Sequence, residues 1–222
     1  MKAIITDYKR PSEELLKKFE GMPAALAHEA LGKRGALTND FKPIYSGAKF
    51  AGAALTIKGY PGDNLMLHRA ISIAHKGDVM MATVNGFTEA GLWGEIASEA
   101  AKAMGIQALV TDGAVRDVDE IEKVGFPVFS RAVSIKGTTK KQAGLLNHPI
   151  EIGGVYVKPG DIVIGDTDGV CVIPLEEAGA VLKRANQITD FENSVVEGIR
   201  AGKLTIDLLG LRPALKELGL DD

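Results

Sequence analysis

Two glycine-rich segments carry the residue types best suited to chemistry. The first, NGFTEAGLWGE, runs from Asn85 to Glu95, and the second, VTDGAVRD, runs from Val110 to Asp117. In the second segment, Arg116 offers a permanently charged, planar fork for a carboxylate or a keto oxygen. Asp117 offers a hard oxygen ligand, and Mg²⁺ or Mn²⁺ binds through one or two such carboxylates while keeping several waters. The pair therefore predicts a site for a small anion and a divalent cation.

The spacing of the two segments predicts that they meet. Between Glu95 and Arg116 lie 20 residues. At ~1.5 Å and ~3.3 Å of rise per residue, a helix of about 11 residues and a returning strand of about 5 each span roughly 16 Å. The chain should therefore return to the edge of the sheet that it left, and Glu95, Arg116 and Asp117 should lie at the carboxyl ends of neighbouring strands, where open α/β sheets hold ligands. Gly91 and Gly94 would let the backbone approach a ligand, and the helix opening at Glu95 would bind a carboxylate.

The Arg-Asp pair also has simpler interpretations. Most such pairs are exposed ion pairs, and an Asp at the start of a helix is often its N-cap. The setting favours a site, because a buried strand, a DGA turn and the glycine-rich turn one crossover earlier converge on Arg116 and Asp117. Asn64, in the segment GDN, either caps the helix that follows it or lines the same site.

Other polar or reactive residues are explained without a site. The four histidines lack the spacing of zinc ligands and are expected at the surface or as caps, with His68, close behind GDN, as the exception. Cys171 lies in an apolar strand, where a core position is expected. Trp93 is expected to pack at the mouth of the pocket. Three aspartates between residues 161 and 168 fit the demands of tight turns, because a calcium-loop spacing with its closing Glu is absent.

The apolar pattern predicts an α/β core flanked by helices. Two helices are expected first, over residues 11–20 and 23–35. Strands over 51–60, 78–84, 107–113 and 126–132 then alternate with helices over 64–76, 94–104 and 118–125. Residues 148–174 predict a small β layer, residues 175–201 a long helix, and the stretch after Pro213 a final amphipathic helix. This organisation predicts one domain over residues 1–222, with a core of about 23–174 and a C-terminal helical arm of about 175–222.

Composition and charge argue against several classes of partner. The chain of 222 residues has a formal net charge of -3, so it lacks the excess of basic side chains that a nucleic-acid partner requires. Its single cysteine allows no internal disulfide, which fits a reducing compartment and makes the cytoplasm the expected location. No stretch approaches the roughly 20 apolar residues of a membrane helix, so no membrane contact is expected.

Taken together, the two segments resemble a known enzyme family. GLWGE, 20 further residues and the RD of VTDGAVRD are similar to the signature of the metal-dependent 4-hydroxy-4-methyl-2-oxoglutarate/4-carboxy-4-hydroxy-2-oxoadipate aldolases, a family that includes the regulator of ribonuclease activity A. The resemblance runs from about Pro23 through GDN and the RD core to Pro174, and continues more weakly in AGKLTIDLLGLR. It implies a layered β/β/α sandwich of the phosphohistidine-domain (RraA-like) type with helical N- and C-terminal extensions. It also implies homotrimers or homohexamers with active sites between subunits.

The resemblance assigns a role to each residue of the site. Arg116 binds the keto acid, Asp117 anchors Mg²⁺ or Mn²⁺, and Glu95 holds a metal-bound water at a position where many relatives have Asp. The substrate carboxylate is received by the backbone of Gly94, Glu95, Ile96 and Ala97.

Two further residues are counted with the substrate-binding set. Asn64 is one of them. The other comes from a C-terminal glutamate of the adjacent subunit, which completes the site in the aldolases. Counting back from AGKL points to Glu192 for this role, although the surrounding TDFENSVVEG departs from the basic helix of the family.

The function implied by the resemblance is that of a divalent-metal-dependent class II pyruvate aldolase. Such an enzyme cleaves 4-hydroxy-2-keto acids to pyruvate and a carbonyl product, and it also decarboxylates oxaloacetate, because both reactions pass through the enolate of pyruvate. The alternative is a non-enzymatic binding protein like the regulator of ribonuclease activity A. The retained Glu95, Arg116 and Asp117, and the helical arm after Leu175, favour the enzyme, since short regulator-like proteins lack that arm.

Overall fold

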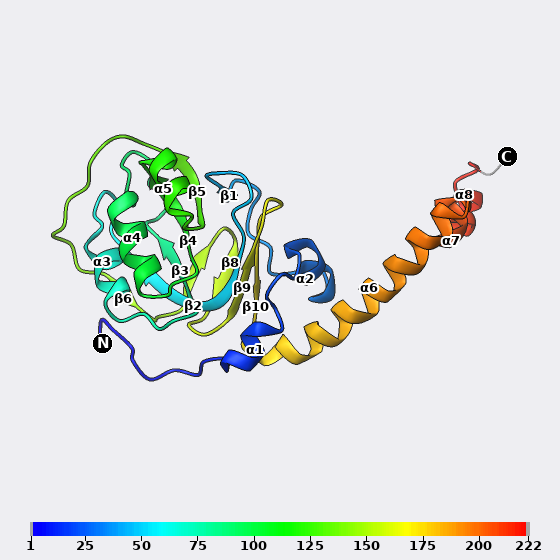
Figure 1. Cartoon of the computed structure of the whole chain (residues 1–222), viewed down its shortest axis with the longest axis horizontal. Coiled ribbons are helices and arrows are strands. Elements are labelled where there is room, and N and C mark those ends of the chain that lie inside the picture. The colour runs from blue at the N-terminus through cyan, green and yellow to red at the C-terminus, as the bar shows by residue number, and fades with distance from the viewer. Residues whose placement is uncertain (1, 221–222) are drawn as a thin grey trace.

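A curved eight-stranded sheet forms the centre of the fold. The computed structural model describes residues 2–220, with a layered core from which a helical arm extends (Figure 1). The strand order is β1-β5-β4-β3-β2-β9-β10, and β6 also pairs with β2. The neighbours β2, β3, β4 and β5 are parallel, whereas β1, β6, β9 and β10 pair antiparallel with their neighbours. The bounds are β1 Lys42–Pro43, β2 Phe50–Lys58, β3 Asp78–Thr83, β4 Ala108–Val115, β5 Val128–Val133, β6 Leu145–Leu146, β9 Ile162–Gly165 and β10 Val170–Ile173.

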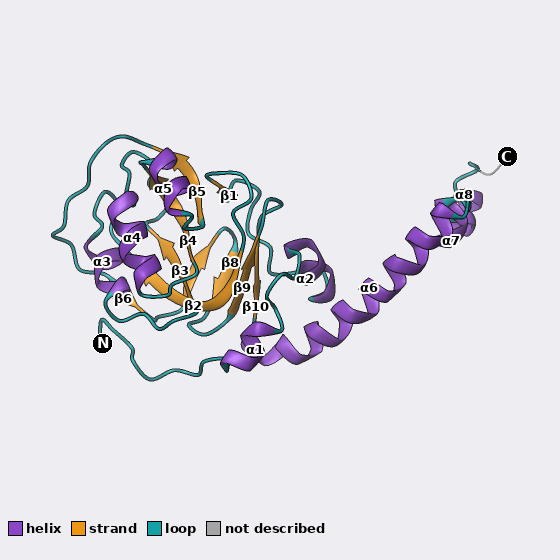
Figure 2. Cartoon of the chain, viewed as in Figure 1, coloured by secondary structure: helices purple, strands orange, loops and turns teal. Residues whose placement is uncertain are grey.

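Both faces of the parallel strands are buried, which explains their nearly continuous apolar sequences. Because side chains alternate along a strand, Met80 and Leu109 join one apolar cluster while Met81 and Val110 join another. The first cluster includes the inner faces of α3 (Leu65–Ile71), α4 (Glu95–Ala103) and α5 (Val118–Val124), and the second includes the hairpin of β7 (Ile150–Ile152) and β8 (Val155–Val157). Helices, sheet and hairpin thus form three layers (Figure 2), which confirms the predicted β/β/α arrangement.

A third apolar cluster attaches the terminal helices to the core. It joins β9 and β10 to α2 (Ala24–Ala30) and to the first turns of α6 (Ala178–Arg200), and α1 (Glu13–Lys17) packs at its edge. A short 3₁₀ helix, η1 (Leu175–Glu177), precedes α6. The 23 residues of α6 span roughly 34 Å at 1.5 Å per residue and lead away from the core (Figure 1). The base of this helix is buried, whereas its distal part extends beyond the layers.

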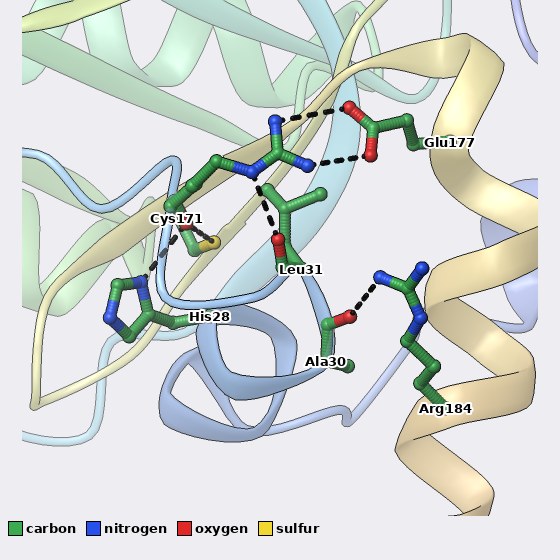
Figure 3. A network of polar contacts seen from close by, with 7 residues as sticks. His28, Ala30, Leu31, Cys171, Glu177 and Arg184 are labelled. Carbon is green, nitrogen blue, oxygen red and sulfur yellow. Dashed lines mark hydrogen bonds and ion pairs between the residues drawn. The ribbon is translucent and has the colours of Figure 1, made fainter.

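Polar contacts fix the base of the arm (Figure 3). Nη1 of Arg184 on α6 donates to the carbonyl of Ala30 at the end of α2, with a distance of 3.2 Å. Arg34 donates from Nη2 to Oε2 of Glu177 at 2.7 Å and from Nε to the carbonyl of Leu31 at 3.2 Å. These contacts satisfy carbonyls at the C-terminus of α2, which have no partner within the helix, and link the end of α2 and the residues that follow it to η1 and α6.

The C-terminal stretch differs from its prediction. Two short helices replace the single one, α7 (Thr205–Leu208) and α8 (Arg212–Glu217), and α7 was not predicted. They are separated at Gly210, whose φ of 64° is left-handed and ends the first helix. Pro213 lies in the first turn of α8, as expected for a proline at a helix start. No helix among the described residues is long and apolar enough to cross a membrane.

Candidate active site

The two glycine-rich segments lie side by side at the carboxyl ends of β3 and β4. These strands are parallel neighbours, and the backbone beyond them continues the pairing. Leu92 N–H donates to the Ala114 carbonyl at 2.9 Å, and Arg116 N–H donates to the Trp93 carbonyl at 2.9 Å. The predicted return of the chain to the same sheet edge is therefore confirmed.

A buried carboxylate organises the first segment from below. Asp112, only 7% exposed, accepts hydrogen bonds from the N–H groups of Val84 and Gly86 at 2.7 and 3.0 Å. Its Oδ2 also accepts from the hydroxyl of Thr83 at 2.6 Å. The Asp112 side chain of β4 thus accepts hydrogen bonds from the backbone that follows β3, whose buried N–H groups need acceptors. The sequence analysis assigned no role to this aspartate, although it lies inside VTDGAVRD.

The backbone of Asp117 is in an unusual conformation. Its φ of 57° and ψ of 44° are left-handed, a region that non-glycine residues rarely adopt outside Asn and Asp. The residue occupies the N-cap position of α5, yet within the described chain its carboxylate makes no capping hydrogen bond to that helix. Instead Oδ2 faces α4 and lies 3.3 Å from the N–H of Glu95. The interpretation of Asp117 as a simple helix cap is therefore excluded.

The ion pair between Arg116 and Asp117 is loose. Arg116 Nε lies 3.5 Å from Asp117 Oδ2, and the two side chains are 46% and 40% exposed. Exposed pairs of this kind contribute little to stability. Among residues 2–220, no acceptor forms a hydrogen bond with the Arg116 guanidinium. Most of its planar set of donors is thus free to receive a carboxylate or an oxyanion.

Gly94 allows the close approach between α4 and Asp117. A Cβ atom at residue 94 would lie 2.2 Å from Asp117 Oδ2 and 3.4 Å from Cγ of Arg116. Any side chain here would push the carboxylate away from the helix. The first turn of α4 also exposes N–H groups that have no partner within the helix, which makes it suitable for binding an anion.

These features surround one cavity of about 340 Å³. Such a volume is in the range of small-molecule sites. Three parts of the chain contribute to its wall. They are the first glycine-rich segment with the start of α4, the Arg116–Asp117 pair, and residues at the start of α3 and after β5. The lining residues are Asn64, His68, Gly91, Leu92, Trp93, Gly94, Ile96, Ala97, Arg116, Asp117, Gly137, Thr138 and Lys140.

Comparison with known proteins identifies the family. The sequence model of the RraA-like family, described as Aldolase/RraA, matches residues 24–172. The chain belongs to this family. A protein of Halalkalibacterium halodurans, provisionally named 4-hydroxy-4-methyl-2-oxoglutarate aldolase, is 34% identical over 174 residues, which cover 78% of this chain and 83% of the relative.

Solved structures confirm the RraA-like fold. An uncharacterized protein from Pseudomonas syringae pv. tomato superimposes with a TM-score of 0.83 at 25% identity, covering 95% of this chain and all of the other. The RNA-processing inhibitor RraA from Thermus thermophilis superimposes with a TM-score of 0.64 at 26% identity, covering 68% of this chain and 92% of its own. Both an aldolase name and a regulator name therefore occur among the relatives.

Asn64 lines the cavity of this RraA-like chain, which is one of the two roles expected for it, and its side chain does not cap α3. Although Asn64 occupies the N-cap position, its Nδ2 donates to the Leu92 carbonyl at 3.0 Å, and it makes no capping bond. The preceding Asp63 supplies the cap, because its Oδ1 accepts from Leu65 N–H at 2.9 Å. Asn64 Oδ1 is buried and has no donor within the described chain. The side chain therefore connects the α3 turn to the first glycine-rich segment.

Two predicted site residues do not line the cavity of this single chain. Glu95 begins α4, its backbone N–H contacts Asp117, and its exposed side chain is not part of the wall. Glu192 is exposed in the second half of α6, which leads away from the core. Their roles toward a metal-bound water and toward a neighbouring subunit remain predictions.

The sequence analysis missed the far wall of the cavity. Gly137, Thr138 and Lys140 come from the connection after β5, which forms this far wall, and they line the cavity together with His68 of α3. Burial, and then the positive charge of Lys140, lower the pKa of His68, so its ring is neutral at pH 7. The three lysines in KGTTKK and the GDN motif were the available signals, but only their folding together reveals the wall.

The residues set aside in the sequence analysis are structural, as predicted. Cys171 is 1% exposed, and burial raises the pKa of its thiol to about 12, far above the range of a reactive thiolate. Trp93 is also 1% exposed, stacks on Phe126 and donates from Nε1 to Ser98 Oγ at 2.7 Å. Asp161 accepts the N–H groups of Lys158 and Leu175, as the turn interpretation requires.

Proposed function

We propose that this chain is a divalent-metal-dependent class II pyruvate aldolase. It cleaves 4-hydroxy-2-keto acids to pyruvate and a carbonyl product, and it also decarboxylates oxaloacetate. The supporting observation is that three groups line one cavity of about 340 Å³. They are the Arg116 guanidinium, which makes only a loose ion pair, the Asp117 carboxylate, which does not cap α5, and the N-terminus of α4. These are the three groups needed to hold a 2-keto acid by its carboxylate and to neutralise charge on its keto oxygen.

The keto acid is oriented by two anion-binding groups of the chain. The N–H groups of Ile96 and Ala97 in the first turn of α4 bind the C1 carboxylate, because they have no partners within the helix. The Arg116 fork binds the keto oxygen. As the C3–C4 bond breaks, the 4-hydroxyl loses its proton to solvent and becomes the carbonyl of the second product. The bonding electrons form the enolate of pyruvate, whose charge Arg116 stabilises, and a solvent proton added at C3 completes pyruvate. Such preorganised donors typically contribute on the order of 10²–10³ in rate.

The donor set fits Mg²⁺ or Mn²⁺ better than zinc. Within the described residues, no group of three or more His, Cys, Asp or Glu side chains is arranged to hold a metal ion, whereas structural and catalytic zinc sites need three or four such ligands. Among the described residues that line the cavity, Asp117 alone has a carboxylate, and Mg²⁺ binds through one or two carboxylates and several waters. When bound, the cation withdraws charge from the keto oxygen. Asp117 would hold it, with Glu95 holding one of its waters.

Pyruvate release tests the proposal directly. A panel of 4-hydroxy-2-keto acids and oxaloacetate is incubated with the purified chain and Mg²⁺ or Mn²⁺, and pyruvate is measured. Chelation is expected to abolish release, and adding either cation is expected to restore it. Borohydride is expected to trap no substrate on the protein, because no lysine imine forms. Full activity in excess chelator would refute the metal dependence, and a covalent adduct would refute the class II mechanism.

The regulator-like alternative predicts a different result. A protein that only binds a partner releases no pyruvate from any keto acid, with or without metal. Its function would also survive loss of the Arg116 fork, which lines a small-molecule cavity. Absence of pyruvate release over the whole panel, together with correct folding, would favour this alternative.

We also propose that the chain assembles as a homotrimer or homohexamer with active sites between subunits. Apolar side chains are exposed on the arm, where Phe191 is 53% and Leu218 72% exposed, and beside the cavity, where Ile96 is 82% exposed. A second copy of the chain covering them would bring Glu192 to a neighbouring cavity. Light scattering should give a trimer or hexamer mass, and an active monomer would refute the assembly.

Mixing two inactive variants tests the shared site. Arg116→Lys and Glu192→Gln chains are unfolded together and refolded. If each site combines Arg116 of one subunit with Glu192 of another, roughly a quarter of the sites in randomly mixed oligomers regain both residues. No recovery of activity would place both residues in one subunit or remove Glu192 from the site.

A further inference from the structure

The far wall of the cavity is a segment with little regular structure. Residues 134–144 connect β5 to β6 and contain neither a helix nor a strand, apart from one isolated bridge between Thr139 and Asp63. At its beginning, the segment contacts the first glycine-rich segment through a 2.9 Å hydrogen bond from Gly91 N–H to the Lys136 carbonyl. Its middle part reaches the cavity through Gly137, Thr138 and Lys140. Its position must therefore be set by a few specific contacts.

Asp63 supplies three of these contacts, and the backbone of Gly62 and Asn64 pairs with Thr139. Oδ2 of Asp63 accepts from the Thr139 hydroxyl at 2.6 Å, from Lys141 N–H at 2.6 Å and from Gln142 N–H at 3.2 Å. The carboxylate is buried, with the residue 3% exposed, and its other oxygen caps α3 at Leu65. The residues on both sides of Lys140 are thus held by one carboxylate.

Lys140 is the second permanent cation of the cavity. In residues 2–220, no carboxylate pairs with its ammonium, whereas the nearby Lys136 pairs with Glu89 at 2.6 Å. Lys140 lines the same cavity as Arg116 and His68, and its charge contributes to the lowered pKa of His68. A keto acid bound by Arg116 would therefore share the cavity with Lys140.

We propose that Lys140 determines which group the cavity accepts beyond C3 of the keto acid, and that Asp63 is the positioning residue that holds Lys140 there. The preferred far group is an anion, because an unpaired ammonium in a partly enclosed cavity gains a charge-assisted hydrogen bond from a carboxylate and none from an alkyl group. The proposal rests on the proposed function, since it requires the keto-acid end of the ligand to bind near Arg116.

Binding without turnover tests the proposal. Two keto acids of equal size are titrated by calorimetry in excess Mg²⁺: 2-oxoglutarate, and 5-methyl-2-oxohexanoate, in which an isopropyl group replaces the second carboxylate. The wild-type chain is expected to prefer 2-oxoglutarate. Lys140→Met should lower the affinity for 2-oxoglutarate about tenfold, as for loss of one hydrogen bond to a charged group, and leave the affinity for 5-methyl-2-oxohexanoate unchanged. Lys141→Met is the matched control, because that side chain does not line the cavity.

Asp63 is tested in the same assay. Asp63→Asn replaces one acceptor oxygen by an NH2 donor and removes the charge, so it cannot keep both the cap at Leu65 and the three bonds to the connection at their present strength. It should reduce the preference for 2-oxoglutarate while Lys140 is still present, and it should have no further effect in the Lys140→Met background. Thr139→Val removes only the side-chain bond and should give a smaller change in the same direction, which keeps the test open if Asp63→Asn fails to fold.

The outcomes separate the two proposals. If the wild-type chain binds neither keto acid, the proposed function fails and this inference fails with it. If both acids bind but Lys140→Met leaves their affinity ratio unchanged, Lys140 is not the determinant, although the aldolase proposal stands. If Asp63→Asn and Thr139→Val leave the ratio unchanged in folded protein, Asp63 has no positioning role.

Discussion

Replacing Arg116 by Lys separates catalysis from stability. The substitution keeps a positive charge and loses the planar fork, so it is not conservative where two oxygens are bound at once. The ion pair with Asp117 has a separation of 3.5 Å between two side chains that are 46% and 40% exposed, so its loss costs at most about 1 kcal/mol of stability. For a chain of this size, that corresponds to a shift in melting temperature of roughly 2–4 °C or less.

The expected effect on turnover is much larger. If the fork stabilises the enolate, kcat/KM for pyruvate release should fall at least ~10²-fold, which corresponds to about 2.7 kcal/mol of lost transition-state stabilisation. Both quantities are measured on one preparation by a pyruvate assay and thermal unfolding. Arg34→Lys is the control, since Arg34 forms an ion pair with Glu177 at 2.7 Å on the other side of the molecule. Wild-type turnover in Arg116→Lys, with or without a loss of stability, would remove Arg116 from the mechanism.

Three further predictions concern residues around the core. Gly94→Ala should reduce kcat/KM by about 10²-fold, because its Cβ would displace the Asp117 carboxylate by an ångström or so; unchanged Mg²⁺-dependent turnover would contradict this reason. Arg10→Met should cost about 3 kcal/mol in urea unfolding, since Arg10 Nη2 lies 2.6 Å from the fully buried Asp78 carboxylate. Burial raises the pKa of Asp78, so this loss should shrink as the pH falls and the carboxyl becomes protonated. Burial raises the pKa of Asp63, but four hydrogen bonds to its carboxylate outweigh this effect, so the folded-state pKa is lowered. The stabilising effect of the carboxylate should therefore be complete above the unfolded pKa of about 3.9 and vanish as the pH falls through the folded value. The stability difference between the wild-type chain and Asp63→Asn should therefore decrease below pH ~4, and a difference independent of pH would contradict this.

The sheet and the near wall of the site could be predicted because they depend on local periodicity. Alternating strand and helix patterns predicted an α/β core, and the 20 residues between Glu95 and Arg116 placed the two glycine-rich turns at one edge. The RraA-like resemblance added the order of the layers. Each of these inferences uses spacing along the chain, which a sequence displays directly.

The far wall could not be predicted because it depends on contacts between distant segments. Asp63 and Lys141 are 78 residues apart, and nothing in either segment alone shows that a carboxylate will hold the connection after β5. Asn64 shows the same limitation. Its position before a helix predicted a cap, but its neighbour Asp63 competes for that role and frees the amide to reach Leu92. The break at Gly210 depended on a left-handed backbone, which the amphipathic pattern does not reveal.

The two walls of the cavity differ in how easily each can change. The near wall is part of the layered core, because Gly94, Arg116 and Asp117 follow strands whose displacement would disturb the packing of both apolar clusters. The far wall is a connection of eleven residues, 134–144, held by the Asp63 carboxylate and a few backbone hydrogen bonds. Mutations in such a connection are tolerated far better than those in a strand. With the roles proposed above for the two walls, exchange of this connection would change substrate choice and conserve the bond-breaking chemistry, so grafting residues 134–144 from a relative is the direct route to a new specificity.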